Sequence, residues 1–203
     1  MPILEVAFVA IAFLYSVIIH EISHGLMAQS MGDTTARDAG RLTLNPIKHL
    51  DLFGSILLPL MLLVIQSPFL FGYAKPVPYN PLNLSDQKYG PAKVAIAGPL
   101  SNIILAVLFG LVLRFLPDSV GPLFPALLSK VVYINLLLAV FNLVPIQPLD
   151  GHWLLLTFLP AKWIEVKYFL VRYGVFLFLF FIIFFSHVLS PLINFLYSVI
   201  VGH

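Results

Sequence analysis

Residues 3–31, ILEVAFVAIAFLYSVIIHEISHGLMAQSM, join an apolar stretch long enough to cross a membrane to the run His20-Glu21-Ile22-Ser23-His24. On an α-helix, residues four apart lie on one face, so His20 and His24 can present two imidazoles to one metal ion, with Glu21 beside them. An ionisable group inside a membrane helix costs roughly 2.5 to 3.5 kcal/mol to insert. The cluster therefore indicates a functional metal site rather than polar side chains satisfied within a helix bundle.

The composition is that of an integral membrane protein. The chain of 203 residues is 60% hydrophobic and 10% charged, whereas soluble domains are about 45 to 50% apolar and about 25% charged. A net charge of +2 gives no argument for nucleic-acid binding, and the absence of cysteine leaves nitrogen and oxygen as the metal donors. The N-terminus lacks the features of a cleaved signal peptide, so it is expected to remain as the first span.

Further apolar segments predict an all-α multi-pass protein of about five to six transmembrane helices in a single domain, 1–203. They cover residues 92–116, 124–145, 168–185 and 188–201, with a shorter one at 52–66. If the first helix begins at Ile3, His20 lies roughly 26 Å along an axis that crosses about 30 Å of hydrocarbon. The metal site should therefore lie near the face where the first span leaves the membrane.

The distribution of Lys and Arg decides how segment 52–81 is placed. If 52–81 is re-entrant and returns to its starting side, only Arg114 and Lys130 lie opposite the other nine cationic residues. If it crosses fully, the split is five against six. Cytoplasmic loops carry an excess of Lys and Arg, so the asymmetry favours a re-entrant segment, an outside N-terminus and a metal site near the cytoplasmic face.

A catalytic zinc usually has three protein ligands, so a third must come from elsewhere in the chain. Asp150 is the best candidate, in Asn142-Leu143-Val144-Pro145-Ile146-Gln147-Pro148-Leu149-Asp150-Gly151. Prolines end the preceding helix, and Gly151 allows an unusual backbone turn. An Asp-Gly pair is also common in plain turns. The re-entrant topology brings Asp150 to the same face as His20 and His24, and the crossing topology leaves it opposite.

These residues resemble the site-2 proteases, which are zinc intramembrane metalloproteases with an HExxH helix and a later NxxPxPxLDG segment. The similarity includes Ala97-Gly98-Pro99-Leu100-Ser101-Asn102, Gly40-Arg41-Leu42-Thr43-Leu44-Asn45-Pro46 and Phe71-Gly72-Tyr73-Ala74-Lys75-Pro76-Val77-Pro78, the last two as in compact members without PDZ or CBS domains. Together these segments span about residues 20–152 of a predicted core, 1–152, and the predicted accessory helices, 165–203, carry little family signature. Gln147 departs from the family pattern, where a proline or another small apolar residue is commoner.

The resemblance implies that His20, His24 and Asp150 bind Zn2+ and that Glu21 is the catalytic base. It also implies that Asn142 stabilises the oxyanion, although a helix-to-helix hydrogen bond is the alternative for this residue. The expected reaction is hydrolysis of peptide bonds in or near transmembrane segments of a membrane-anchored protein or signal-peptide substrate. The enzyme would be a multi-pass protein in the lipid bilayer of the cell membrane.

Two other functions stay open at this point. A metal transporter or metal-binding membrane protein would also place His and Asp within spans, but a transport path needs polar residues through the full thickness, and 168–201 is almost wholly apolar. A catalytically inactive, substrate-binding relative would not need Glu21.

Within residues 34–45, Asp38-Ala39-Gly40 is a candidate turn and Arg41-Leu42-Thr43-Leu44 alternates, which predicts a small β-hairpin after the first helix. Its edge could pair with an extended substrate, and a plain cytoplasmic loop is the alternative. Lys75-Pro76-Val77-Pro78 could form a second substrate wall, although a membrane-surface loop fits better. Four further histidines have no partner at ligand spacing, and of these only His152 is near enough to Asp150 to support it. These histidines are His49, His152, His187 and His203.

Overall fold

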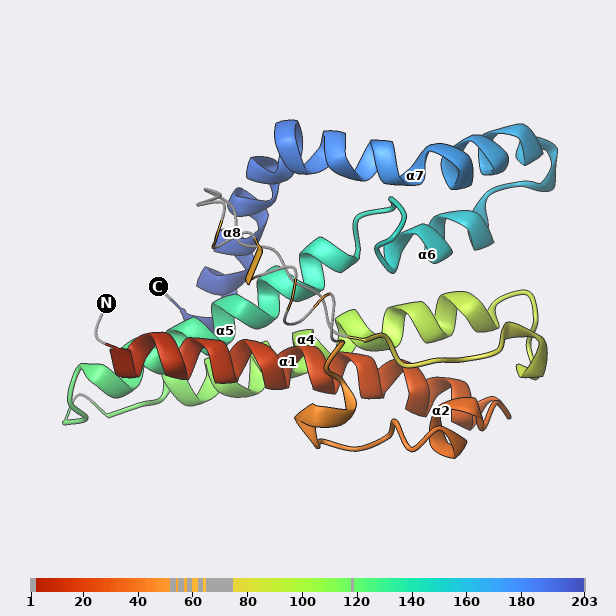
Figure 1. The fold of residues 1–203 in the computed structure, drawn as a ribbon. Helices are drawn as coiled ribbons and strands as arrows, with labels where there is room; N and C mark the ends of the chain where they lie inside the picture. The colour runs from red at the N-terminus through yellow and green to blue at the C-terminus, as the bar shows by residue number, and fades with distance from the viewer. Residues whose placement is uncertain are drawn as a thin grey trace.

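The computed structural model describes residues 3–51, 75–117 and 119–202, together with positions 54, 57, 60, 61 and 64. Over these residues the chain is helical, without strands. The helices are α1 (Ile3–Ser30), α2 (Thr35–Asp38), α4 (Gly90–Arg114), α5 (Leu123–Asn142), α6 (Gly151–Phe158), α7 (Ile164–Phe185) and α8 (Leu189–Val201) (Figure 1).

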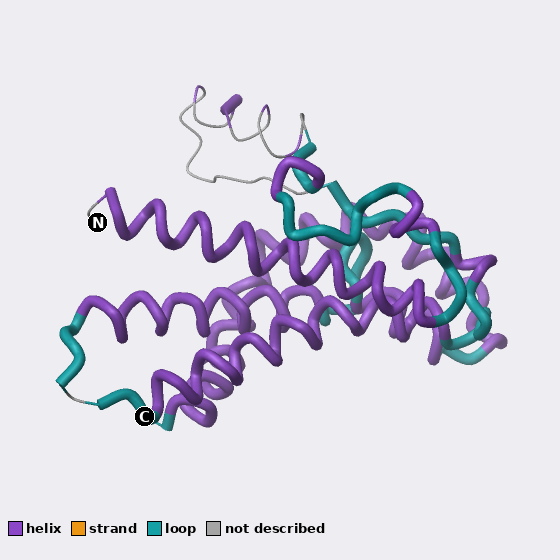
Figure 2. Tube along the Cα trace, turned by 90° about the horizontal axis from the view of Figure 1, so that it is seen from below, coloured by secondary structure: helices purple, strands orange, loops and turns teal. Residues whose placement is uncertain are grey.

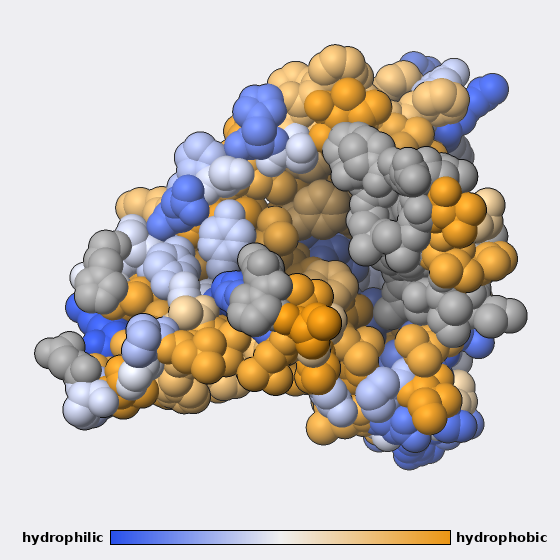
Figure 3. Space-filling model, turned by 60° about the vertical axis from the view of Figure 1, so that its left-hand side comes forward, coloured by the Kyte–Doolittle hydropathy of each residue, from blue (hydrophilic) through white to orange (hydrophobic). Residues whose placement is uncertain are grey.

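Four helical stretches among the described residues are long and apolar enough to cross a membrane: α1, α4, α5 and the 41-residue stretch Ala161–Val201, which contains α7 and α8. The all-helical class with several candidate spans is therefore confirmed, and the expected count of five to six only in part. Segments 168–185 and 188–201, expected as two spans, belong to this one stretch. Apolar side chains cover large areas of the molecular face in Figure 3, as lipid contact requires.

Helices α1, α4 and α5 form the centre of the bundle, and α8 packs against α4 and α5 (Figures 1 and 2). Among the described residues, the largest buried apolar cluster comes from α4, α5 and α8, and Gly110 of α4 lets Ile200 of α8 approach closely. At the end remote from the metal-site residues, Lys130 of α5 forms an ion pair with Glu5 of α1. The bundle thus holds α1 against α5 over most of its length.

The connection from α1 to α4 begins and ends at the same end of the bundle. Asp33, which is fully buried, accepts hydrogen bonds from the backbone and hydroxyl of Thr35, from the Asn80 amide and from the Asn83 side chain. The Ser85 amide also donates to the Met31 carbonyl. Helix α4 therefore starts where α1 ends. The predicted re-entrant path of 52–81 itself falls mostly on residues 52–74, which lie outside the described residues apart from the isolated positions above.

The predicted β-hairpin at 34–45 is wrong. Residues 35–38 form the short helix α2, and its Ala36 is buried against Gly25 of α1. The side chain of Asp33 accepts the Thr35 amide and so begins a helical turn in place of a strand. The following residues are held by side chains, since His49 Nε2 bonds the Thr43 carbonyl. Such local side-chain bonds compete with a β-ladder, and four alternating residues were too few to outweigh them.

We expect Asp33→Ala to lower the free energy of unfolding by about 2 to 3 kcal/mol, because it leaves several buried donors unpaired. Burial raises the pKa of Asp33, but the bonds from Thr35, Asn83 and Asn80 outweigh it and lower the pKa below its ordinary value. The stabilisation is therefore present at neutral pH and lost as pH falls below about 4. Thermal unfolding in detergent measures this. The control is Asp38→Ala, whose exposed carboxylate should matter by less than about 0.5 kcal/mol.

Candidate metal centre

Helix α1 presents His20 and His24 on one buried face, one turn apart. Their rings meet edge to face, and their Nε2 atoms are 3.1 Å apart. The side chains are only 7% and 11% exposed. The i, i+4 spacing of the sequence therefore produces the paired imidazoles that it predicted.

The hydrogen-bond partners of the two rings determine where their protons lie. His24 Nδ1 is 2.7 Å from the Val94 carbonyl oxygen, which can only accept, so Nδ1 carries the proton. His20 Nδ1 is 2.7 Å from Asn102 Oδ1, and the Asn102 amide nitrogen donates to the Ser16 carbonyl, which fixes the orientation of that amide. In the neutral form of both rings, each Nε2 atom therefore carries the lone pair that a metal ion can bind.

Asp150 brings the third donor from the far side of the sequence. Helix α5 ends at Asn142, and the chain turns back so that Asp150 Oδ2 lies 3.0 Å from His20 Nε2 and 3.3 Å from His24 Nε2. Apart from these two imidazoles, no side chain or backbone group of the described residues donates a hydrogen bond to this buried oxygen. Gly151 allows the turn because a Cβ there would lie 2.3 Å from the Leu143 carbonyl oxygen.

Three lone-pair atoms thus face one another in a buried space, all within 4.8 Å. They repel one another unless a cation lies between them. In a tetrahedral site with bonds of about 2.0 to 2.1 Å, zinc ligands stand about 3.3 Å apart, close to the separations seen here. The residues present therefore fit a zinc ion.

Gly98 of α4 forms the floor of this space. A Cβ at Gly98 would lie 2.5 Å from His24 Nε2 and 2.6 Å from His20 Nε2. Real Cβ atoms do not approach other atoms so closely, so any larger residue must displace the imidazoles. Gly98 belongs to the segment quoted above for its family resemblance, but its role depends on how α4 meets α1, which the sequence does not show.

A buried polar chain leads from His20 into the bundle. Asn102 of α4 donates to Asn135 of α5, and Asn135 donates to the Ser16 hydroxyl of α1. Both asparagines are fully buried. Neither asparagine was predicted to have a function, although two amides in otherwise apolar spans are a signal that the sequence contains.

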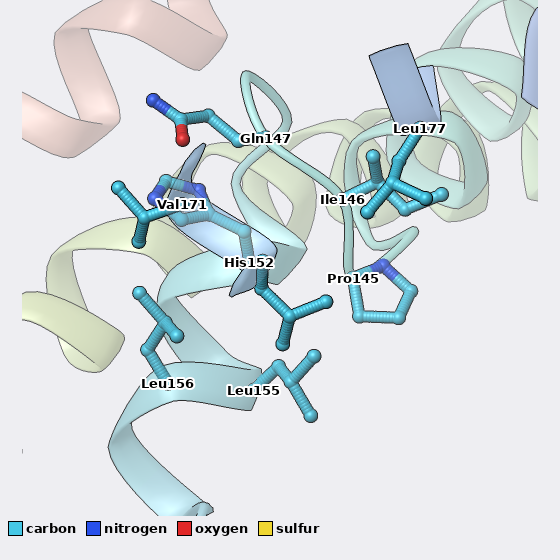
Figure 4. Close-up of a pocket in the computed structure, with 9 residues that line it drawn as sticks. Pro145, Ile146, Gln147, His152, Leu155, Leu156, Val171 and Leu177 are labelled. Atoms are coloured by element: carbon cyan, nitrogen blue, oxygen red, sulfur yellow. The ribbon is translucent and has the colours of Figure 1, made fainter. Parts of the chain in front are cut away.

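Two further predicted residues lie apart from the three donors. Asn142 donates to the Leu138 carbonyl of its own helix, one turn back. His152 Nδ1 bonds the Leu149 carbonyl, not Asp150, and the ring lies with Gln147 and Val171 between α6 and α7 (Figure 4). A cavity of about 10 Å³ there has room for about one water.

Glu21, the predicted catalytic base, follows His20 in α1. Its Oε2 accepts the Val77 amide at 2.8 Å.

The fold and the donors define a helical protein with several candidate membrane spans and a buried His, His, Asp group that could hold a metal ion. YwhC of Bacillus subtilis, named "Putative zinc metalloprotease", is 37% identical over 95% of this chain and 89% of its own length. Two further relatives carry the same description: Rip2 of Mycolicibacterium smegmatis, 29% identical over 69% of this chain and 52% of its own, and MJ0611 of Methanocaldococcus jannaschii, 46% identical over 30% of each.

The chain therefore belongs to the site-2 protease family. No family model matches the sequence, and no solved structure matches it.

Replacing Gly98 by Ala should remove metal binding, because the added methyl group takes the space of the two imidazole nitrogens. We expect the purified variant to retain less than a tenth of the zinc bound by the wild type, measured by elemental analysis after dialysis. Gly110→Ala on the same helix is the control, since its Cβ would meet Ile200 of α8 at 2.3 Å and not the histidines. Gly110→Ala should unfold at a lower temperature than the wild type and still bind zinc. Full zinc occupancy in Gly98→Ala would contradict the proposed metal site.

Asn102→Leu should weaken zinc binding about 10- to 100-fold, because the bond that holds the His20 tautomer and ring orientation is lost. Competition with a chromogenic chelator measures the affinity. Ser101→Ala, whose hydroxyl bonds only the Gly98 carbonyl among the described contacts, is the matched neighbour and should stay within about threefold of the wild type. Equal affinities for the two variants would show that Asn102 does not position His20.

Proposed function

We propose that this protein is a zinc-dependent intramembrane protease in which His20, His24 and Asp150 bind Zn2+ and Glu21 is the catalytic base. The observation that carries the proposal is the convergence of the Nε2 atoms of His20 and His24 and the Oδ2 atom of Asp150 on one buried point. The names of the relatives, zinc metalloproteases, support the same metal and reaction class.

Zinc, when bound, supplies Lewis-acid activation of water and of the scissile carbonyl. The protein supplies the proton transfers. Glu21, adjacent in sequence to one ligand, takes the proton of the attacking water and delivers it to the leaving amine as the peptide bond breaks, work typically worth about 10² to 10⁴ in rate. Among the described residues the Val77 amide bonds Oε2 and no group bonds Oε1, so we assign the proton transfer to Oε1.

Asn142 remains the proposed donor to the developing oxyanion. Its amide is engaged with the Leu138 carbonyl one turn back. To act on substrate it would exchange that bond for one to the substrate oxygen, which becomes a stronger acceptor as charge develops.

The depth of the site supports a substrate anchored in the bilayer. His20 lies 17 residues into a first span of 28 residues, roughly 26 Å from its start. Together with the Lys and Arg asymmetry, this depth supports a reaction near the cytoplasmic face of the cell membrane. A peptide bond within a helix is shielded, so the substrate must unwind before Glu21 acts. We propose that residues 1–203 form one membrane-embedded domain.

A metal transporter is less well supported. The buried polar side chains of α1, α4 and α5 bond to one another or to backbone, as in the link from Asn135 through Asn102 to His20. They form a closed network around the site. Helices α7 and α8 bury almost no polar side chain.

Glu21→Gln separates the candidate functions. We expect it to keep zinc at wild-type stoichiometry and to lower cleavage at least 100-fold, because an amide cannot accept the proton. Membranes from cells carrying each form, compared by quantitative proteomics of membrane peptides, should show an intact anchored protein or signal-peptide remnant that accumulates only in the variant.

That substrate is then incubated with purified wild-type and variant protein in detergent, with and without a zinc chelator. Cleavage by wild type only, abolished by chelation and restored by Zn2+, is the expected result. Equal cleavage by Glu21→Gln would contradict the proposal, and zinc flux into vesicles by both forms would indicate a transporter.

A further inference from the structure

An extended segment, residues 75–78, passes directly over the glutamate of α1. Its sequence is Lys75-Pro76-Val77-Pro78, and we call it the strap. The Val77 amide donates to Glu21 Oε2 at 2.8 Å. Proline has no amide hydrogen, so Val77 holds the one N–H between Lys75 and Tyr79. That single donor is the one that meets the carboxylate.

Helix α1 is shaped to receive the strap at this point. Gly25 lies one turn after Glu21, on the same face. A Cβ at Gly25 would come 2.8 Å from Val77 Cγ1 and 2.6 Å from Leu42 Cδ2. The Val77 side chain is therefore seated on the bare backbone of Gly25, and Val77 is only 6% exposed.

Arg41 fixes the strap from its other side. Its Nη2 donates to the Lys75 carbonyl at 2.6 Å and to the Pro76 carbonyl at 3.4 Å. The residue is 6% exposed, so this cation is withdrawn from water to bond backbone oxygens. The Lys75 amide donates to the His49 carbonyl at 2.9 Å. The strap is thus held at its start and carries its amide to Glu21.

We propose that the strap and Arg41 position the Glu21 carboxylate for proton transfer. This inference rests on the proposed function. The Val77 amide fixes one carboxylate oxygen and thereby the rotation of the group, which leaves Oε1 in a defined direction for the attacking water. A carboxylate at the end of a flexible side chain otherwise samples several rotamers, and misplacement by about 1 Å can cost about 100-fold in rate. Arg41 acts through the strap and is a positioning residue.

Val77→Pro tests the amide itself. Val77 precedes Pro78, and such residues are confined to extended backbone, where proline is also accommodated. We expect kcat to fall about 10- to 100-fold relative to Val77→Ala, which keeps the amide and trims the side chain. KM and bound zinc should match in the two variants, because neither the metal ligands nor substrate binding is altered.

Two further measurements address the same contact. Arg41→Met should lower kcat about tenfold, and Arg41→Lys, which can still donate to one carbonyl, should recover part of that loss. In wild-type protein the Val77 amide should exchange slowly with deuterium, and Glu21→Ala should speed its exchange at least tenfold. This second readout does not require catalysis.

Several results would overturn the inference while the proposed function stands. One is a Val77→Pro enzyme as fast as Val77→Ala, and another is a faster one, which would mean that the strap obstructs the base. Loss of zinc in Val77→Pro, or unchanged exchange of the Val77 amide in Glu21→Ala, would also overturn it. Failure of the proposed function is distinct, because Glu21→Gln would then cleave as well as the wild type.

Discussion

The arrangement of the site depends on three metal-donor atoms, the Nε2 atoms of His20 and His24 and the Oδ2 atom of Asp150, which are held at one buried point. Two come from a helix face of α1 and one from the turn after α5, more than a hundred residues away. Mutual repulsion makes such an arrangement unfavourable without a cation. Three features of the fold allow these atoms to meet. They are the connection that returns to the starting end of the bundle, Gly98 on α4 beside the two imidazoles, and the turn with prolines before Asp150.

The helix bundle supports the site through polar contacts that apolar packing alone could not provide. Asn102 and Asn135 link α1, α4 and α5 and set the tautomer of His20. In a membrane, packing between apolar helices has little directional preference, whereas buried amides fix register. The same network that orients the ligand therefore also orients the helices. Arg41 and the strap extend this order from the metal ligands to the glutamate beside them.

Sequence could predict the parts of the site that local geometry determines. The i, i+4 spacing predicted the histidine pair. The asymmetry of Lys and Arg, together with the proline-rich turn, predicted that Asp150 lies at the same end of the bundle. Gly98 could not be found this way, because its role depends on the approach of two helices. The role of the Val77 amide could not be predicted from the sequence either, since every residue other than proline carries a backbone amide. The prediction of a hairpin at 34–45 was wrong because it was based on the alternation of side chains alone. It did not include the buried carboxylate of Asp33, which begins a helical turn.

X-ray absorption at the zinc edge of the purified wild-type protein measures whether the three donors hold a metal ion. We expect one tightly bound zinc per chain with two imidazoles and oxygen donors at about 2.0 to 2.2 Å. Asp150→Asn should then lose zinc or change the oxygen shell, while both imidazoles remain where zinc is retained. Protein isolated in zinc-replete medium without bound metal, or with a metal shell lacking histidine, would contradict the account.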